Sequence, residues 1–202
     1  MLSEKEKLDE LTYLGIKLNE VRDLDILMEL VLADARRFVN ADAGSIYIKE
    51  EDTLQFSYTQ NDTLQKRLPK GEKLIYSTFT LPINTKSISG YVATTGQLLN
   101  LPDVYQIDAS APYDFGKKFD EESGYKTRSV ITVPLETRRG DILGILQIIN
   151  AQDQDNWIVP FTEADEKLML HFASIAAVAL ERAQMTRSIL LRMIRMSEMR
   201  DP

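Results

Sequence analysis

Residues 123–150 read SGYKTRSVITVPLETRRGDILGILQIIN, and the architecture is inferred most directly from them. Two apolar, β-branched runs, Val130–Leu135 and Ile142–Ile149, flank a polar turn that contains Gly140 and Asp141. This pattern predicts an antiparallel hairpin. In the second run, apolar side chains occupy both parities, so we expect this strand to be covered on both faces of the sheet.

Gln147 is the one side chain in the second run that can form hydrogen bonds. A buried amide without partners costs about 1–3 kcal/mol. We therefore expect the Gln147 amide to be satisfied either by neighbouring protein groups or by a ligand.

The composition is that of an ordinary globular chain. Its 202 residues are 44% hydrophobic and 27% charged, which suits one well-buried domain with an appendage. The net charge of −7 argues against a general nucleic-acid-binding surface, which needs clustered Lys and Arg. The chain has no long apolar run and no signal-peptide core, so we expect a cytoplasmic location. The absence of cysteine excludes thiol nucleophiles, disulfides and thiolate metal sites.

Periodicity predicts the other elements. Strands are expected at residues 43–49, 54–60, 74–81 and 97–101, and helices at 24–39, 87–95 and 163–196. Residues 61–73 and 152–160 are interpreted as loops. Residues 102–126 form a connection long enough to be a functional lid, for which we expect one helical turn near Lys117–Glu122.

Both ends of the chain carry apolar stripes at helical spacing. Ser3 and Glu6 match a capping box that begins a first amphipathic helix, which either packs on the core or pairs with another subunit. The last helix would span about 50 Å, more than the domain beneath it needs. Apolar residues at its far end favour a partner helix over exposure. We therefore expect a homodimer through the N- and C-terminal helices.

Few residues could support catalysis. The single histidine, His171, falls in the apolar part of the last helix, where a core or interface histidine is commoner than a ligand. One histidine without cysteine leaves few options for zinc. No glycine-rich phosphate-binding motif is present. An enzyme is therefore disfavoured, although Asp120–Glu122 could in principle supply an acid and a base.

A small-molecule pocket is better supported. The short helix after Lys86 would present free backbone N–H groups at Ile88 and Ser89, an arrangement that attracts anions. An aromatic face with a few directed polar groups is how a planar heterocycle is bound. The lid supplies both kinds of group: Tyr113, Phe115, Phe119, Asp120, Ser123 and Thr127. In the alternative reading, Tyr113 and Phe119 only fasten the lid to the sheet.

Several motifs occur together in an order that resembles GAF domains, most closely those that regulate cyclic-nucleotide phosphodiesterases. They are residues 98–103 (LLNLPD), residues 124–129 (GYKTRS), the hairpin, and Asn150 followed by residues 161–166 (FTEADE). The resemblance implies an α+β fold related to PAS domains. In that fold a six-stranded antiparallel sheet carries the terminal helices on one face and a lid with short helices on the other, with the ligand between sheet and lid.

The same resemblance implies which residues line the ligand pocket. By their place in the motifs, the positions that match cyclic-nucleotide-binding members are Ser45, Gln60, Ile88, Ser89, Tyr113, Asp120, Ser123, Thr127 and Gln147. The implied regulatory ligand is cyclic GMP or cyclic AMP. The lid of this chain is several residues longer than the lid of those members.

The phosphodiesterase group has a signature Asn-Lys, a variable gap, and then Phe-x-x-x-Asp-Glu. This chain keeps Asn150, Phe161, Asp165 and Glu166, but Ala151 stands where the lysine would be. The ion pair between that lysine and the aspartate cannot form. Losing a partly exposed pair costs under ~1 kcal/mol, so we expect the fold to be kept and ligand gating to differ.

The C-terminal sequence resembles the linker helix that enters HD-type phosphohydrolase domains, including the HD-GYP type, in bacterial signalling proteins. We therefore expect an N-terminal dimerisation helix at 1–22, a GAF domain at 23–184, and a C-terminal signalling helix at 185–202 that leads to an effector beyond Pro202. The leading hypothesis is a small-molecule sensor that controls this phosphodiesterase. The alternative is a ligand-free dimerisation module whose pocket is filled by its own side chains, with the Gln147 amide satisfied in a closed interior.

Overall fold

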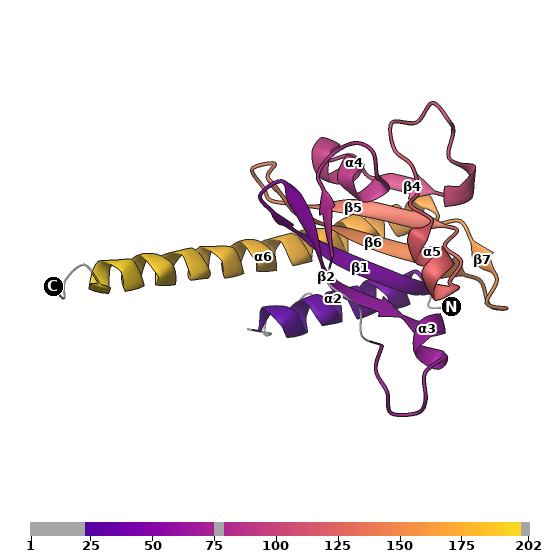
Figure 1. The fold of residues 1–202 in the computed structure, drawn as a ribbon, viewed down its shortest axis with the longest axis horizontal. Helices are drawn as coiled ribbons and strands as arrows, with labels where there is room; N and C mark the ends of the chain where they lie inside the picture. The colour runs from indigo at the N-terminus through magenta and orange to yellow at the C-terminus, as the bar shows by residue number, and fades with distance from the viewer. Residues whose placement is uncertain (1–22, 75–78, 199–202) are drawn as a thin grey trace.

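The computed structural model describes residues 23–74 and 79–198 (Figure 1). In chain order the elements are α2 (Leu24–Phe38), β1 (Ala41–Glu50), β2 (Thr53–Asn61), α3 (Asp62–Lys66), β3 (Thr80–Pro82), α4 (Ile88–Thr95), β4 (Leu99–Leu101), the 3-10 helix η1 (Val104–Gln106), α5 (Lys118–Ser123), β5 (Val130–Glu136), β6 (Ile142–Gln152), β7 (Ile158–Val159) and α6 (Glu163–Glu198). The helix predicted for residues 1–22 lies outside the described residues.

One antiparallel sheet forms the centre of the molecule. Its strands run in the order β3-β2-β1-β6-β5-β4, and β7 pairs with the end of β6. The predicted hairpin is confirmed as β5 and β6. Strand β6 is buried on both faces, because Leu146 and Ile148 join the core on one face while Ile145 joins a separate apolar cluster on the other.

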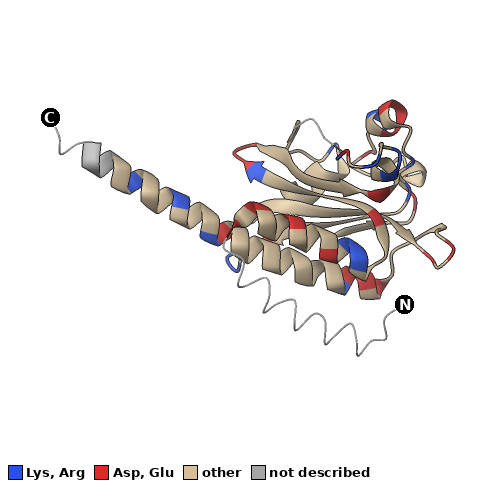
Figure 2. Cartoon of the chain, turned by 90° about the horizontal axis from the view of Figure 1, so that it is seen from below, with Lys and Arg blue, Asp and Glu red and all other residues tan. Residues whose placement is uncertain are grey.

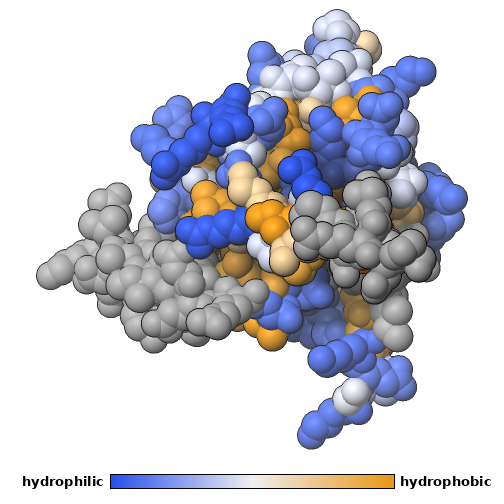
Figure 3. Space-filling view, turned by 90° about the vertical axis from the view of Figure 1, so that its left-hand side faces the viewer, coloured by the Kyte–Doolittle hydropathy of each residue, from blue (hydrophilic) through white to orange (hydrophobic). Residues whose placement is uncertain are grey.

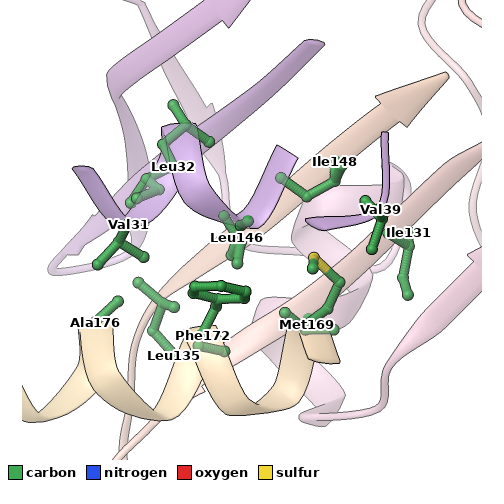
Figure 4. Packing of buried hydrophobic residues seen from close by; sticks show 14 of the residues in the cluster. Val31, Leu32, Val39, Ile131, Leu135, Leu146, Ile148, Met169, Phe172 and Ala176 are labelled. Carbon is green, nitrogen blue, oxygen red and sulfur yellow. The ribbon is translucent and has the colours of Figure 1, made fainter. Parts of the chain in front are cut away.

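Helices α2 and α6 lie side by side and cover one face of the sheet (Figure 2). Asp23 begins α2 by accepting a hydrogen bond from the Ile26 N–H at 3.1 Å, which is ordinary N-terminal capping. Figure 4 shows Phe172 of α6 and Leu146 of β6 meeting between the helices and the sheet, and both side chains are fully buried. The main core therefore lies in this layer.

The opposite face carries α4 and the connection between β4 and β5. Ser87 caps α4 through the Gly90 N–H at 3.1 Å, and Gly96 ends the helix with a φ of +70°. Gly90 is required by close approach, because a Cβ there would lie 2.3 Å from the Asn84 carbonyl oxygen. This fixes the start of α4 tightly against the loop that precedes it.

Three predicted connections differ in the structure. Residues 61–73, predicted as loop, contain α3, which begins where the Asn61 side chain accepts a hydrogen bond from the Leu64 N–H at 2.8 Å. Residues 152–160 contain β7, which pairs with the end of β6. Of the strand predicted at 74–81, the described part forms only Thr80–Pro82. Each difference concerns a segment of five residues or fewer, too short for periodicity to show.

Helix α6 extends far beyond the sheet (Figure 1). Its 36 residues correspond to about 54 Å at 1.5 Å per residue. Large apolar side chains on the projecting part are about half exposed: Met185, Ile189, Leu190, Leu191, Met193 and Ile194. Figure 3, viewed from the side on which α6 projects, shows hydrophobic side chains at the surface among charged ones. Within the described ranges, no helix combines the length and apolar character that crossing a bilayer requires.

Gly144 provides a test of the close approach between β1 and β6. A Cβ at this position would lie 2.2 Å from the Tyr47 carbonyl oxygen, which belongs to the neighbouring main chain. We expect Gly144→Ala to lower the free energy of unfolding by about 2 kcal/mol or more, measured by urea denaturation. Gly116→Ala is the control, because no atom lies within 4 Å of its added Cβ. Equal stability of the two variants would contradict the packing described here.

Candidate functional site

A cavity of about 220 Å³ lies between the sheet and the connection that follows β4. Its walls come from β1, β2, β5 and β6, from the start of α4, and from residues 114–120 of the lid. The volume is slightly below the range of about 300–1,000 Å³ that is usual for ligand pockets. A cavity of this size holds a small molecule or several waters.

Seven of the nine predicted pocket residues border this cavity: Ser45, Gln60, Ile88, Ser89, Asp120, Thr127 and Gln147. Tyr113 and Ser123 do not. The Tyr113 ring packs edge-on against Tyr91, with centroids 4.9 Å apart. The Ser123 hydroxyl donates to the Phe119 carbonyl at 2.6 Å and accepts from the Tyr125 N–H at 3.1 Å, so it closes the end of α5. Sequence spacing placed both residues in the lid without showing which way each side chain points.

Gln60 borders the cavity, but its amide serves the opposite face of the sheet. The amide nitrogen donates to the Glu29 carbonyl at 3.1 Å, and the amide oxygen accepts from Arg36 at 3.0 Å, both residues of α2. Neighbouring strand residues point to opposite faces, and it is Thr59 that bonds with Ser45 at 3.1 Å on the cavity side. Gln60 therefore borders the cavity as predicted, while its amide bonds to α2.

One wall of the cavity was not predicted from the sequence. It consists of Tyr47, Phe56, Phe79 and Leu81, from β1 and from the region where β2 meets β3. The Phe56 and Phe79 rings stack at 4.5 Å, and Tyr47 meets Phe56 edge-on at 5.2 Å. Tyr47 could have been found, because it lies two residues beyond Ser45 on the same strand and therefore on the same face.

Gln147 lies at the centre of a polar cluster on the cavity floor. Its amide nitrogen donates to Thr132 at 3.0 Å and to Ser89 at 3.5 Å. Among the described residues, no hydrogen bond uses its amide oxygen. Protein groups thus satisfy one end of the amide, and the other end stays available in the cavity. Close by, burial raises the pKa of Tyr47 to about 12, and a hydrogen bond with Ser89 lowers it in part.

The lid crosses the start of α4. The Asp114 N–H donates to the Lys86 carbonyl at 3.0 Å, and Asp114 pairs with Ser87 in a parallel bridge. A parallel bridge brings residue 114 against the residues on both sides of Ser87, so the lid main chain partly covers Ile88. Both predicted donors still border the cavity.

Asp120 fastens the lid from inside. Its carboxylate accepts hydrogen bonds from the Tyr105 hydroxyl at 2.8 Å, the Thr127 N–H at 2.8 Å and the Thr127 hydroxyl at 2.7 Å. The bond to Asp120 raises the pKa of Tyr105 to about 12. Asp120 was predicted to read a ligand, yet both of its oxygens already have partners. Its clearest role is to hold α5 against η1 and the start of β5.

The signature residues also connect elements. Asn150, at a φ of +58° and buried, accepts from the Arg128 N–H at 2.7 Å and donates to the Lys126 carbonyl at 2.8 Å and the Tyr125 hydroxyl at 2.9 Å. Only Asn, Asp and Gly adopt such a φ readily, so the identity of this residue follows from its geometry. It ties β6 to the segment that returns from the lid.

The remaining signature residues join α6 to the sheet. Phe161 is buried in the core. The Asp165 carboxylate accepts from the Thr162 N–H and hydroxyl, each at 2.8 Å, and Glu166 accepts from Asn100 of β4 at 2.8 Å. Asp165 therefore has partners at the start of α6 without the lysine that Ala151 replaces. This agrees with the expectation that the fold is kept.

The described residues offer little for metal or acid–base chemistry. Within these ranges no group of three His, Cys, Asp or Glu residues could hold a metal ion. Asp114 and Asp120 are the only charged residues among those described around the cavity. His171 was expected in the core or an interface; the structure places it on the exposed side of α6, so the core position is wrong.

Comparison with known protein families identifies the family to which the chain belongs. The model of the GAF domain family matches residues 23–180, which is most of the chain. The chain therefore belongs to the GAF family.

Two curated relatives are phosphodiesterases. The chain is 35% identical over 100 residues to a dual 3',5'-cyclic-AMP and -GMP phosphodiesterase 11A of Takifugu rubripes, covering 50% of this chain and 10% of that protein. It is 27% identical over 172 residues to a cGMP-specific 3',5'-cyclic phosphodiesterase of Drosophila melanogaster, covering 81% and 14%. The chain thus matches only a small part of each relative.

Solved structures agree on the architecture. The GAF domain of a phosphoenolpyruvate-protein phosphotransferase from Coxiella burnetii has a TM-score of 0.67 at 20% identity, covering 90% of this chain and 96% of that one. A free methionine-R-sulfoxide reductase from Neisseria meningitidis has a TM-score of 0.67 at 16% identity, covering 92% and 96%. At these identities the likeness shows the fold alone. The predicted α+β GAF fold is confirmed.

The raised pKa of Tyr47 predicts a loss of stability at alkaline pH. In the unfolded chain the tyrosine ionises near its usual pKa of 10, whereas in the folded protein it ionises near 12. Between these values only the unfolded state releases the proton, so the free energy of unfolding falls as pH rises, by roughly 1 kcal/mol at pH 11. We expect Tyr47→Phe to decline less than the wild type between pH 8 and pH 11, by about that amount, in urea denaturation. If the free energies of unfolding of the wild type and Tyr47→Phe fall equally with pH, the prediction is wrong.

Proposed function

We propose that this chain is the regulatory, small-molecule-binding sensor of a cytoplasmic signal-transduction protein, and that its cavity receives a cyclic nucleotide or a small planar molecule of similar size. The observation that carries the proposal is the cavity itself, with an available Gln147 amide oxygen on its floor and aromatic rings around it. A planar heterocycle gains from both kinds of contact. The phosphodiesterase relatives make cyclic GMP and cyclic AMP the first candidates.

The electrostatics of the cavity suit a ligand of low charge. No lysine or arginine occurs among the described residues that line it. The start of α4, with Ser89 facing the cavity, supplies partial positive charge from backbone N–H groups and the helix dipole. This partial charge favours the single negative charge of a cyclic phosphodiester, which the Asp114 and Asp120 carboxylates oppose. Ser89, Gln147 and Thr127 then offer neutral hydrogen-bonding groups to the sugar and base.

The projecting part of α6 gives the proposed sensor its output. We propose that residues 185–198 of α6 act as a signalling helix that pairs with its copy in a homodimer and leads to an attached effector, an HD-type phosphohydrolase or phosphodiesterase. The rest of the segment predicted at 185–202 lies outside the described residues. Ligand binding under the lid would shift α6 against its partner. A ligand does this only if it binds the two arrangements with different affinity.

A second candidate function is a ligand-free dimerisation module. It is favoured by the small volume of the cavity and by Asp120, whose oxygens are already bonded within the lid. The available amide oxygen of Gln147 favours the sensor. Binding measurements distinguish the two functions directly.

We expect cyclic GMP or cyclic AMP to raise the melting temperature of the protein. A ligand at 100 times its dissociation constant stabilises the folded state by about 2.7 kcal/mol. Gln147→Met keeps the side-chain volume and removes the amide, so we expect about tenfold weaker binding in calorimetry. Gln106→Met, at an exposed position outside the cavity, is the control and should bind as the wild type does. If neither nucleotide shifts the melting temperature, the ligand-free module is the better description.

Two substitutions on opposite sides of α6 test the proposed dimer. Ile189 and Leu191 are 58% and 49% exposed, but at 100° per residue they point about 200° apart. Ile189 shares its side with Met185 and Met193. We expect Ile189→Glu to weaken dimerisation at least about tenfold, because it places a charge in an apolar seam, and Leu191→Glu to leave it unchanged. Sedimentation equilibrium measures both. If the two substitutions weaken dimerisation equally, the dimer does not form through the side of α6 that carries Met185, Ile189 and Met193.

A further inference from the structure

Tyr125 occupies two environments at once. Its ring borders the cavity and packs with Ala43 and Leu64, and the side chain is only 5% exposed. Its hydroxyl donates to the Asp42 carboxylate at 2.7 Å and accepts from Asn150 at 2.9 Å. Its ring therefore borders the space where a ligand would lie, and its hydroxyl joins a polar network with Asp42 of β1 and Asn150 of β6.

The polar network continues to the helix layer. Asp42 accepts from Arg36 of α2 through its carbonyl oxygen at 2.7 Å, and from Thr63 of α3 through its carboxylate at 2.9 Å. The Arg36 guanidinium is buried and also contacts Asp62 at 2.6 Å and the Gln60 amide at 3.0 Å. One unbroken series of contacts thus runs from the cavity wall to the opposite face of the sheet.

The position of Tyr125 in the chain makes it sensitive to the lid. It follows Gly124, which ends α5 with a φ of +62°. A displacement of the turn at Gly124 by a ligand therefore acts on Tyr125 directly. Because its hydroxyl is buried and has a partner on each side, the ring cannot move without straining the bonds to Asp42 and Asn150. Buried polar groups tolerate the loss of partners poorly.

We propose that Tyr125 is the residue through which occupation of the cavity is transmitted across the sheet to helix α2, by way of Asp42 and Arg36. This inference rests on the proposed sensor function. Helix α2 packs beside α6 in the main core, so a shift of α2 reaches the output helix from within the domain. Tyr125 acts as a positioning residue that couples the cavity to the helix layer.

The proposal is tested by hydrogen exchange of the α2 amides at residues 33–38, which surround Arg36. Without ligand, we expect Tyr125→Phe to raise their exchange rates at least about fivefold, the lower end of ordinary coupling, because the Asp42 carboxylate loses one of its two side-chain donors and keeps only Thr63. Tyr105→Phe is the matched control. It removes a hydroxyl that also bonds to a buried carboxylate on the cavity side, Asp120, but that contact stays within the lid. Its α2 exchange should match the wild type.

A second arm uses cyclic GMP at saturation as the probe. We expect it to protect the same α2 amides in the wild type, and in Tyr125→Phe to keep its effect on melting temperature while losing the α2 protection. Asp42→Asn should reproduce the loss, and exchange in β6 reports any global destabilisation in either variant.

The outcomes distinguish failure of cyclic GMP as the ligand from failure of the transmission through Tyr125. If cyclic GMP fails to bind the wild type, its assignment as ligand fails, and the ligand-free arm still decides whether Tyr125 couples to α2. If Tyr125→Phe and Tyr105→Phe change α2 exchange equally, or if ligand protection of α2 survives in Tyr125→Phe, the proposed transmission is overturned.

Discussion

The constraint on which the structure depends is that β6 is covered on both faces. Leu146 and Ile148 pack under α2 and α6, while Ile145 joins the apolar cluster on the lid face. A strand buried in this way leaves few places for polar groups, and each polar group then needs a partner. Before the final residue of β6, Gln147 and Asn150 are the exceptions, and both bond to groups outside their own strand.

Asn150 and Gln147 lie in two different parts of the lid face, one where hydrogen bonds hold the lid and one that is open as a cavity. Asn150 and Asp120 bind the ends of the lid through main-chain and hydroxyl groups, so this part of the lid is held in place. Between the fastenings lies the cavity, where Gln147 has one end of its amide unused. Asn150 of the family signature and Asp120 thus secure the enclosure, while Gln147 and Ser89, which lie outside the signature, supply polar groups to the cavity.

The proposed ligand site and the proposed output helix occupy opposite faces of one sheet. The cavity lies on the lid face, and α6 carries its exposed apolar residues away from the helix face. Anything that connects them must pass through β1 and β6 or around their ends. The Tyr125, Asp42 and Arg36 contacts pass around one end, where the strands give way to α3 and the lid. Such a route needs no change in the strand register.

The sequence by itself determined the hairpin, the central helices and strands, and a set of nine predicted pocket residues of which seven meet at the cavity, because apolar periodicity and ordered motifs are local properties of the chain. Tertiary structure alone decided side-chain direction and hydrogen-bond partners. The Gln60 amide bonds to Arg36 instead of facing the cavity, and the Asp120 carboxylate bonds to the Thr127 hydroxyl. Phe56 and Phe79 form part of the cavity wall. Partners of this kind lie many residues apart in sequence, and they compete for each polar group only after the elements have packed.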